Sequence, residues 1–166
     1  MATDALNSKD LGHLRRCVDL AAEALAAGDE PFGSVLVDDA GAVLKEDRNQ
    51  IATKNDATMH PEFELARWAA ANMTPAQRAA ATVYTSGEHC PMCSAAHAWV
   101  GLGRIIYVAS AAQLGEWQRG WGVKGAGAAY LPIQQVAPRV KVAGPVPELE
   151  GQIKALHEQS AKSLKQ

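Results

Sequence analysis

Two short groups of residues carry the side chains best suited to chemistry. The first is His60-Pro61-Glu62 and the second is Cys90-Pro91-Met92-Cys93. Imidazole and thiolate groups are typical ligands of Zn²⁺, and three protein ligands leave the fourth tetrahedral position open, as catalytic zinc sites require. We therefore expect His60, Cys90 and Cys93 to hold one Zn²⁺ per chain.

Glu62 lies two residues beyond His60, where its carboxylate can act without being a ligand. Zinc lowers the pKa of a bound water from about 15.7 toward about 7. A carboxylate nearby can take the proton of that water and pass it to a leaving amine. Because all three ligands stand at the starts of predicted helices, the helix dipoles also favour the thiolate form of the cysteines. The pattern predicts hydrolytic release of ammonia, with Glu62 as the catalytic residue.

Plainer interpretations of these residues stay open. A structural zinc site would need a fourth protein ligand, which His89 or His97 could supply. Cys90 and Cys93 could instead form a redox pair. Glu62 could be a solvated carboxylate that the start of a helix favours.

The elements that must position these groups follow from hydrophobic periodicity and from proline and glycine signals. The predicted helices are Lys9–Ala27, His60–Asn72, Pro91 to Gly101 or Gly103, and Glu148–Leu164. The predicted strands are Phe32–Val37, Ala42–Lys45, Ala81–Thr85, Ile105–Ala109 and Arg139–Ala143. Gln113–Gly127, rich in glycine and tryptophan, is expected to be irregular. Strands separated by helices predict an α/β fold.

Length and composition limit the classes of protein to consider. A chain of 166 residues, with 48% hydrophobic and 20% charged residues, predicts one globular domain over Met1–Gln166. No apolar run reaches the roughly 18 residues of a membrane span. Met1–Asp10 lacks the basic and apolar regions of a secretory signal, so we expect a cytoplasmic protein. A net charge of -2 without a Lys/Arg cluster disfavours a nucleic-acid partner.

Further residues make the sequence similar to the cytidine deaminase superfamily of zinc deaminases. Its signature is His-x-Glu followed by Pro-Cys-x-x-Cys, with the Glu as general acid and base. The likeness covers roughly Leu11 to Ala109 and is closest to the bacterial guanine deaminase and tRNA adenosine deaminase branch. The residues that carry it are Pro31-Phe32-Gly33-Ser34-Val35, Asn49, Asn55-Asp56, Thr85-Ser86, Glu88 and Cys90-Pro91-Met92-Cys93. The resemblance implies a three-layer α/β/α fold with a central five-stranded mixed sheet, usually as a homodimer.

The resemblance also implies substrate contacts. Asn49 matches an asparagine that hydrogen-bonds the base, and Phe32 matches an aromatic residue that packs on the heterocycle. We add His89, which stands where the signature has proline, and Trp121, which stands where guanine deaminases place an acidic residue. In plainer interpretations Asn49 caps a turn, Phe32 fills the core, His89 is a loop residue and Trp121 contacts a second subunit.

The implied substrate is a small heterocycle, with guanine or a related purine base or nucleoside first. Three departures keep other substrates open. Pro61 offers no backbone N–H to a ring, His89 stands in place of the signature proline, and Trp121 stands where an acidic residue is expected, with Glu116 nearby. The C-terminal aromatic residue of guanine deaminases is also missing after Glu148. The alternatives are adenosine in tRNA, cytosine, a pterin or a triazine, and, outside enzymes, an inactive interaction module on the same fold.

Overall fold

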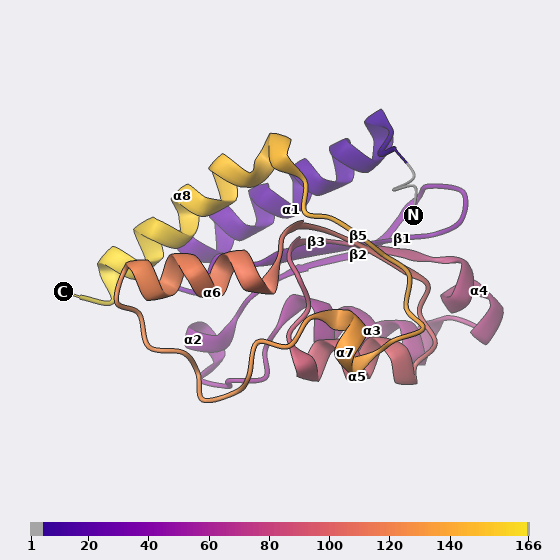
Figure 1. The fold of residues 1–166 in the computed structure, drawn as a ribbon. Helices are drawn as coiled ribbons and strands as arrows, with labels where there is room; N and C mark the ends of the chain where they lie inside the picture. Colours follow the sequence, from indigo (N-terminus) through magenta and orange to yellow (C-terminus); the bar gives the residue numbers. More distant parts are fainter. Residues whose placement is uncertain (1–4, 166) are drawn as a thin grey trace.

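The computed structural model describes residues 5–165 of the chain (Figure 1). Residues 1–4 and Gln166 lie outside the described residues. The predicted domain Met1–Gln166 includes all of these residues. The segment Met1–Asp10, for which no secretory signal is expected, includes residues 1–4. None of the helices within 5–165 combines the length and hydrophobicity needed to cross a bilayer.

A five-stranded mixed sheet forms the centre of the fold, as predicted. Its strands lie in the order β2-β1-β3-β4-β5. Strand β1 is antiparallel to both β2 and β3, whereas β4 is parallel to β3 and β5. The strands are β1 (Gly33–Val37), β2 (Val43–Arg48), β3 (Thr82–Gly87), β4 (Arg104–Ala109) and β5 (Val142–Ala143). Every residue of β1 is buried, whereas the edge strand β2 is half-exposed, which matches the four consecutive charged residues that end it.

Helices cover both faces of the sheet, so the predicted three-layer α/β/α arrangement is confirmed (Figure 1). On one face lie α1 (Ser8–Ala26), α6 (Ala111–Gly120) and α8 (Pro147–Ser163). On the other lie α3 (Pro61–Asn72) and α5 (Pro91–Trp99), together with the short α7 (Ile133–Val136). Each face has its own hydrophobic cluster, one centred on Leu14, Ile106 and Ile153 and the other on Leu36, Leu65 and Ile105.

The prediction of an irregular segment at Gln113–Gly127 is wrong in its first half, because α6 runs from Ala111 to Gly120. Ser110 caps this helix. Its hydroxyl oxygen accepts a hydrogen bond from the Gln113 N–H, and its own N–H donates to Gln113 Oε1. This reciprocal cap offsets the helix-weakening effect of Gly115.

Other boundaries also differ from the prediction. Strand β2 extends to Arg48 instead of ending at Lys45, and β5 comprises Val142–Ala143 alone instead of Arg139–Ala143. Two further short helices, α2 (Ile51–Lys54) and α4 (Pro75–Ala80), were not predicted. Helix α2 positions a candidate site residue, because it directly follows Asn49 and Gln50.

Candidate active site

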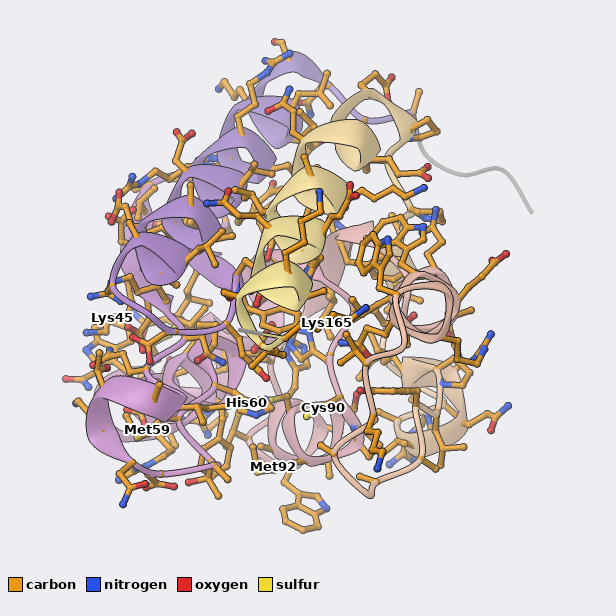
Figure 2. All side chains as sticks on the ribbon, turned by 90° about the vertical axis from the view of Figure 1, so that its left-hand side faces the viewer. Lys45, Met59, His60, Cys90, Met92 and Lys165 are labelled. Carbon is orange, nitrogen blue, oxygen red and sulfur yellow. The ribbon has the colours of Figure 1, made fainter. Side chains whose placement is uncertain are left out.

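The three predicted metal ligands come together at the starts of two helices on one face of the sheet. His60 is the N-cap of α3 and Cys90 is the N-cap of α5, with Cys93 in the first turn of α5. His60 Nδ1 lies 3.6 Å from Cys90 Sγ and 3.6 Å from Cys93 Sγ. All three ligand atoms lie within 4.8 Å of one another. Figure 2 shows His60 and Cys90 side by side at this place.

Proline fixes where both helices begin. Pro61 and Pro91 occupy the first helical positions, where φ is already helical and the missing N–H has no helical acceptor to lose. His60 and Cys90 therefore stay in extended conformation just outside their helices, with φ/ψ of -89°/136° and -66°/168°. The side chains of the two cap residues are thus free to converge instead of lying along the helix surface.

The donor set fits Zn²⁺. A tetrahedral ion with Zn–S of about 2.3 Å and Zn–N of about 2.0–2.1 Å separates nitrogen and sulfur by about 3.6 Å, which is the distance observed for both cysteines. Among the described residues, no other His, Cys, Asp or Glu joins this group. The site therefore has three protein ligands, as a catalytic zinc site requires.

Hydrogen bonds inside the group fix its protonation without metal. The Cys93 thiol and His60 donate toward Cys90 and lower its pKa to about 4. The same contact with Cys90 raises the pKa of His60 to about 9. Cys93, as the donor to Cys90 and a buried thiol, has its pKa raised well above the usual value.

Neither histidine proposed as a fourth ligand is placed to serve. The His97 Nε2 donates to the Gly103 carbonyl at 2.8 Å. His89 is fully buried, and its ring meets that of His97 edge-on with centroids 5.4 Å apart. Both ring nitrogens of His89 lack a hydrogen-bond partner among the described residues. His89 therefore points into the interior.

Glu62 lies beside the metal group and is buried, not solvated. Its side chain lies in the first turn of α3, and the residue is 5% exposed. The Thr85 hydroxyl donates to Glu62 Oε1 at 2.9 Å, while Oε2 lies 3.9 Å from Cys93 Sγ. Burial raises the pKa of Glu62 to about 7. One carboxylate oxygen is held in place, and the other faces the metal group.

Ser34 extends this support, a role that sequence reasoning missed. Its hydroxyl donates to Thr85 Oγ1 at 2.9 Å across the β1–β3 pair, where the two residues stand opposite each other. The available signal was a single hydroxyl residue in the otherwise apolar, buried strand β1, opposite the hydroxyl-rich strand β3. A buried polar side chain needs a partner, and opposite positions in adjacent strands supply one.

Asn49 is held by two hydrogen bonds that leave one end of its amide free. Its backbone N–H donates to the Phe32 carbonyl at 3.0 Å, and its Oδ1 accepts from the Ile51 N–H at 3.0 Å. The amide nitrogen Nδ2 is buried and has no partner among the described residues. Asn49 caps the turn into α2, as its plainer interpretation has it, and still presents two N–H donors.

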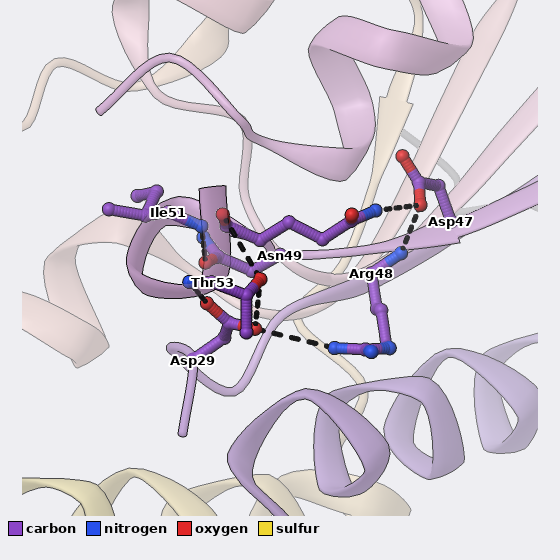
Figure 3. A network of polar contacts seen from close by, with 7 residues as sticks. Asp29, Asp47, Arg48, Asn49, Ile51 and Thr53 are labelled. Carbon is purple, nitrogen blue, oxygen red and sulfur yellow. Dashed lines mark hydrogen bonds and ion pairs between the residues drawn. The ribbon is translucent and has the colours of Figure 1, made fainter. Parts of the chain in front are cut away.

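Asp29 secures the same turn, as Figure 3 shows. Its buried carboxylate accepts from the Thr53 N–H at 2.8 Å and from the Thr53 hydroxyl at 2.9 Å, and it pairs with Arg48 at 3.4 Å. Sequence reasoning assigned no role to Asp29 or Thr53, which are 24 residues apart.

Of the other two predicted substrate contacts, Phe32 lies near the site and Trp121 is placed elsewhere. The Phe32 ring faces Gly87, where a Cβ would lie 3.1 Å from Phe32 Cε1. Trp121 follows α6 and packs against Trp117, with ring centroids 6.4 Å apart. The described contacts do not bring Trp121 to the metal group.

Curated proteins similar to this chain include nucleobase and tRNA deaminases, and also a tRNA(Ile)-lysidine synthase of Deinococcus deserti, 34% identical over 91 residues, which are 55% of this chain and 17% of that protein. Guanine deaminase of Bacillus subtilis is 40% identical over 97 residues, which are 58% of this chain and 62% of that protein. A probable cytosine deaminase of Schizosaccharomyces pombe is 32% identical over 107 residues, 64% of each chain. A tRNA-specific adenosine deaminase of Haemophilus influenzae is 34% identical over 97 residues, 58% of this chain and 56% of that one. The chain thus spans a little under two thirds of these three deaminases.

Solved structures share the fold over nearly the whole chain. Guanine deaminase from Nitrosomonas europaea superposes with a TM-score of 0.72 at 16% identity, covering 95% of this chain and 86% of that one. The Bacillus subtilis guanine deaminase structure gives a TM-score of 0.58 at 28% identity, covering 92% of this chain and 95% of that one.

A family model described as the cytidine and deoxycytidylate deaminase zinc-binding region matches residues 7–109. This is more than half of the chain, and it includes the three-ligand group and Glu62. The chain therefore belongs to the cytidine and deoxycytidylate deaminase zinc-binding family.

Proposed function

We propose that this protein is a zinc-dependent deaminase that hydrolyses the exocyclic C–N bond of a nucleobase, with guanine or a related purine as its substrate. One observation carries the proposal: a buried carboxylate, Glu62, lies against a three-donor zinc site to which no other residue within 5–165 adds a fourth ligand. A purely structural zinc site has no use for either feature.

Zinc, when bound, lowers the pKa of water so that hydroxide is available at neutral pH. Glu62 is the group that moves protons. With its pKa near 7, the carboxylate can accept a proton at Oε2 and return it to the departing amine at neutral pH. Thr85 keeps Oε1 fixed during both transfers.

Asn49 and Phe32 orient the ring in this proposal. The free amide N–H groups of Asn49 would donate to a ring nitrogen or carbonyl, which satisfies an otherwise unpartnered buried group. The Phe32 ring would pack on the flat heterocycle. Guanine comes first because the Bacillus subtilis relative at 40% identity is a guanine deaminase.

The test is ammonia release by zinc-loaded protein from free bases, nucleosides, a pterin, an aminotriazine and a tRNA anticodon stem. The matched control is Glu62→Gln, which keeps the shape of the side chain and removes its proton transfer. We expect release from guanine or another purine, reduced at least about 100-fold in the variant with zinc retained. Release from tRNA alone would favour the adenosine deaminase alternative, and full activity of Glu62→Gln would refute the assigned role.

We further propose a cytoplasmic location, a single domain and a homodimer without a nucleic-acid partner. A net charge of -2 supports a small substrate over a nucleic acid. Trp99, 86% exposed on α5, supports an additional protein contact on that face.

A further inference from the structure

A small cavity adjoins the candidate active site. It has a volume of about 140 Å³ and lies between the loop that precedes β1, the end of α6 and the last turns of α8. Phe32 forms part of its wall, and the same residue accepts the backbone hydrogen bond of Asn49. Glu30 also lines it; burial raises the pKa of Glu30, and the charge of nearby His60 opposes that rise. Phe32 and Glu30 thus link the cavity to Asn49 and His60 of the candidate active site.

His157 lines this cavity from α8, and its ring has no hydrogen-bond partner among residues 5–165. Its residue is 6% exposed, and its ring meets Phe32 edge-on with centroids 4.9 Å apart. Burial lowers its pKa to about 4, so the imidazole is neutral at pH 7. The ring therefore offers one donor and one acceptor, and no hydrogen bond joins either to another residue within 5–165. His157 lines the cavity, where a ligand group can replace water as the hydrogen-bond partner of its ring.

Two more polar groups face the same space. The Tyr130 hydroxyl donates to Gln118 Oε1 at 3.0 Å, which leaves the amide N–H groups of Gln118 free to donate. The Glu30 carboxylate supplies acceptors. The walls therefore offer donors and acceptors together beside an aromatic face, which suits the polar edge of a flat heterocycle.

We propose, building on the deaminase function above, that this cavity is the distal half of the substrate site and that His157 selects bicyclic, purine-type rings. The amino-bearing ring lies at the metal group against Phe32, and the polar edge of the second ring hydrogen-bonds His157. A single pyrimidine ring does not reach this residue.

The experiment measures binding, so that it does not depend on turnover. Guanine and cytosine are titrated calorimetrically into zinc-loaded Glu62→Gln protein, with and without His157→Phe, which keeps an aromatic ring against Phe32 and removes both nitrogens. We expect guanine binding to weaken at least about tenfold, the loss of one buried hydrogen bond, and cytosine binding to stay unchanged. His157→Gln should restore part of the guanine affinity. The matched control is His13→Phe on α1, where the His13 ring packs against Tyr84 of β3; it should change the binding of neither compound.

Equal guanine binding with and without His157→Phe overturns the proposal, and so does equal loss for both rings. If guanine binding depends on His157 while the wild-type chain releases no ammonia, the recognition site stands and the deaminase function fails. If neither ring binds the parent protein, both fail. If His157→Phe misfolds, Tyr130→Phe tests the same cavity. This variant removes the hydrogen bond that the Tyr130 hydroxyl donates to Gln118. A guanine affinity that is unchanged in Tyr130→Phe counts against the proposal.

Discussion

At the scale of single residues, the site is organised by where protons reside. Cys90 is a thiolate above pH about 4, whereas His60 keeps its proton up to about pH 9 and Cys93 remains a thiol because its pKa is raised further. A metal can bind only the neutral imidazole and the two thiolates. Zinc must therefore displace two protons that the metal-free protein holds firmly.

Zinc binding at pH 7 should consequently release about two protons per ion. Titration calorimetry in buffers of different ionisation enthalpy measures this number directly. The logarithm of the apparent affinity should rise with a slope of about two between pH 5 and 8, because His60 and Cys93 are both protonated in that range, and the slope should fall as the pH approaches the His60 pKa of about 9. Release of a single proton would mean that one of these two residues is not a ligand.

In the metal-free protein, the buried carboxylate of Glu62 should lower the free energy of unfolding at high pH. Burial raises its pKa from 4.5 to about 7. The unfolded chain therefore ionises first, and stability falls as the pH rises from about 4.5 to about 7. Glu62→Gln should thus raise the free energy of unfolding by up to about 3 kcal/mol at pH 8, and by little at pH 5.

Urea unfolding of zinc-free protein at both pH values checks this prediction. Glu64→Gln is the matched control, since Glu64 lies in the same turn but pairs with Arg67 near the surface. A gain that is equal at pH 5 and pH 8 would show that the charge on Glu62 is not its source.

At the scale of elements, local signals decided which parts of the site could be predicted. Proline marks the starts of α3 and α5, so the metal ligands and Glu62 could be assigned to helix starts from sequence. Helix α6 was missed because its glycines outweighed the Ser110–Gln113 cap. Asp29 and His157 carry no local signal, because only the packing of α1 and α8 brings them to the site.

Asp29→Asn should loosen the turn that holds Asn49. The amide would keep at most part of the bonds to Thr53 and would lose the pairing with Arg48. We expect KM for the substrate to rise several-fold, with kcat within about twofold, as loss of positioning predicts. Asp38→Asn serves as control, since Asp38 holds the β1–β2 hairpin through Ala40 and Ala42. It should lower stability without changing KM, and parallel KM changes in both variants would contradict the assignment.

The approach of α1 to β1 requires Gly33. A Cβ at this position would collide with Leu20 Cβ and the Cys17 carbonyl, so Gly33→Ala must push the helix off the sheet. We expect a loss of about 1–3 kcal/mol or more in thermal or urea unfolding. Gly12→Ala, on the same helix with nothing within 4 Å, should instead be neutral or stabilising by up to about 1 kcal/mol.

At the scale of the whole molecule, the two helical layers differ in how much hydrophobic surface they expose. The α1–α8 layer buries Leu149 and Ile153 against the sheet. The α3–α5 layer leaves Trp99 86% exposed, next to a surface groove of about 940 Å³ that Arg104 and Arg139 also line. Cys93, on the opposite side of the same helix, is fully buried at the metal group. Helix α5 thus links the metal site to the most exposed large hydrophobic side chain of the described residues.

The proposed homodimer would bury Trp99 against a second copy of the chain, and tryptophan is one of the residues enriched among the side chains that contribute most to interfaces. We expect wild-type protein to sediment as a dimer and Trp99→Lys to weaken dimerisation at least about tenfold, because the lysine charge would have to be desolvated in the contact. Zinc content should not change, because Cys93 points inward. Val43→Lys, at a half-exposed position on the edge strand β2, is the matched control and should leave the dimer intact. A wild-type monomer across micromolar concentrations would remove the homodimer proposal, and a dimer that survives Trp99→Lys would place its interface on another face.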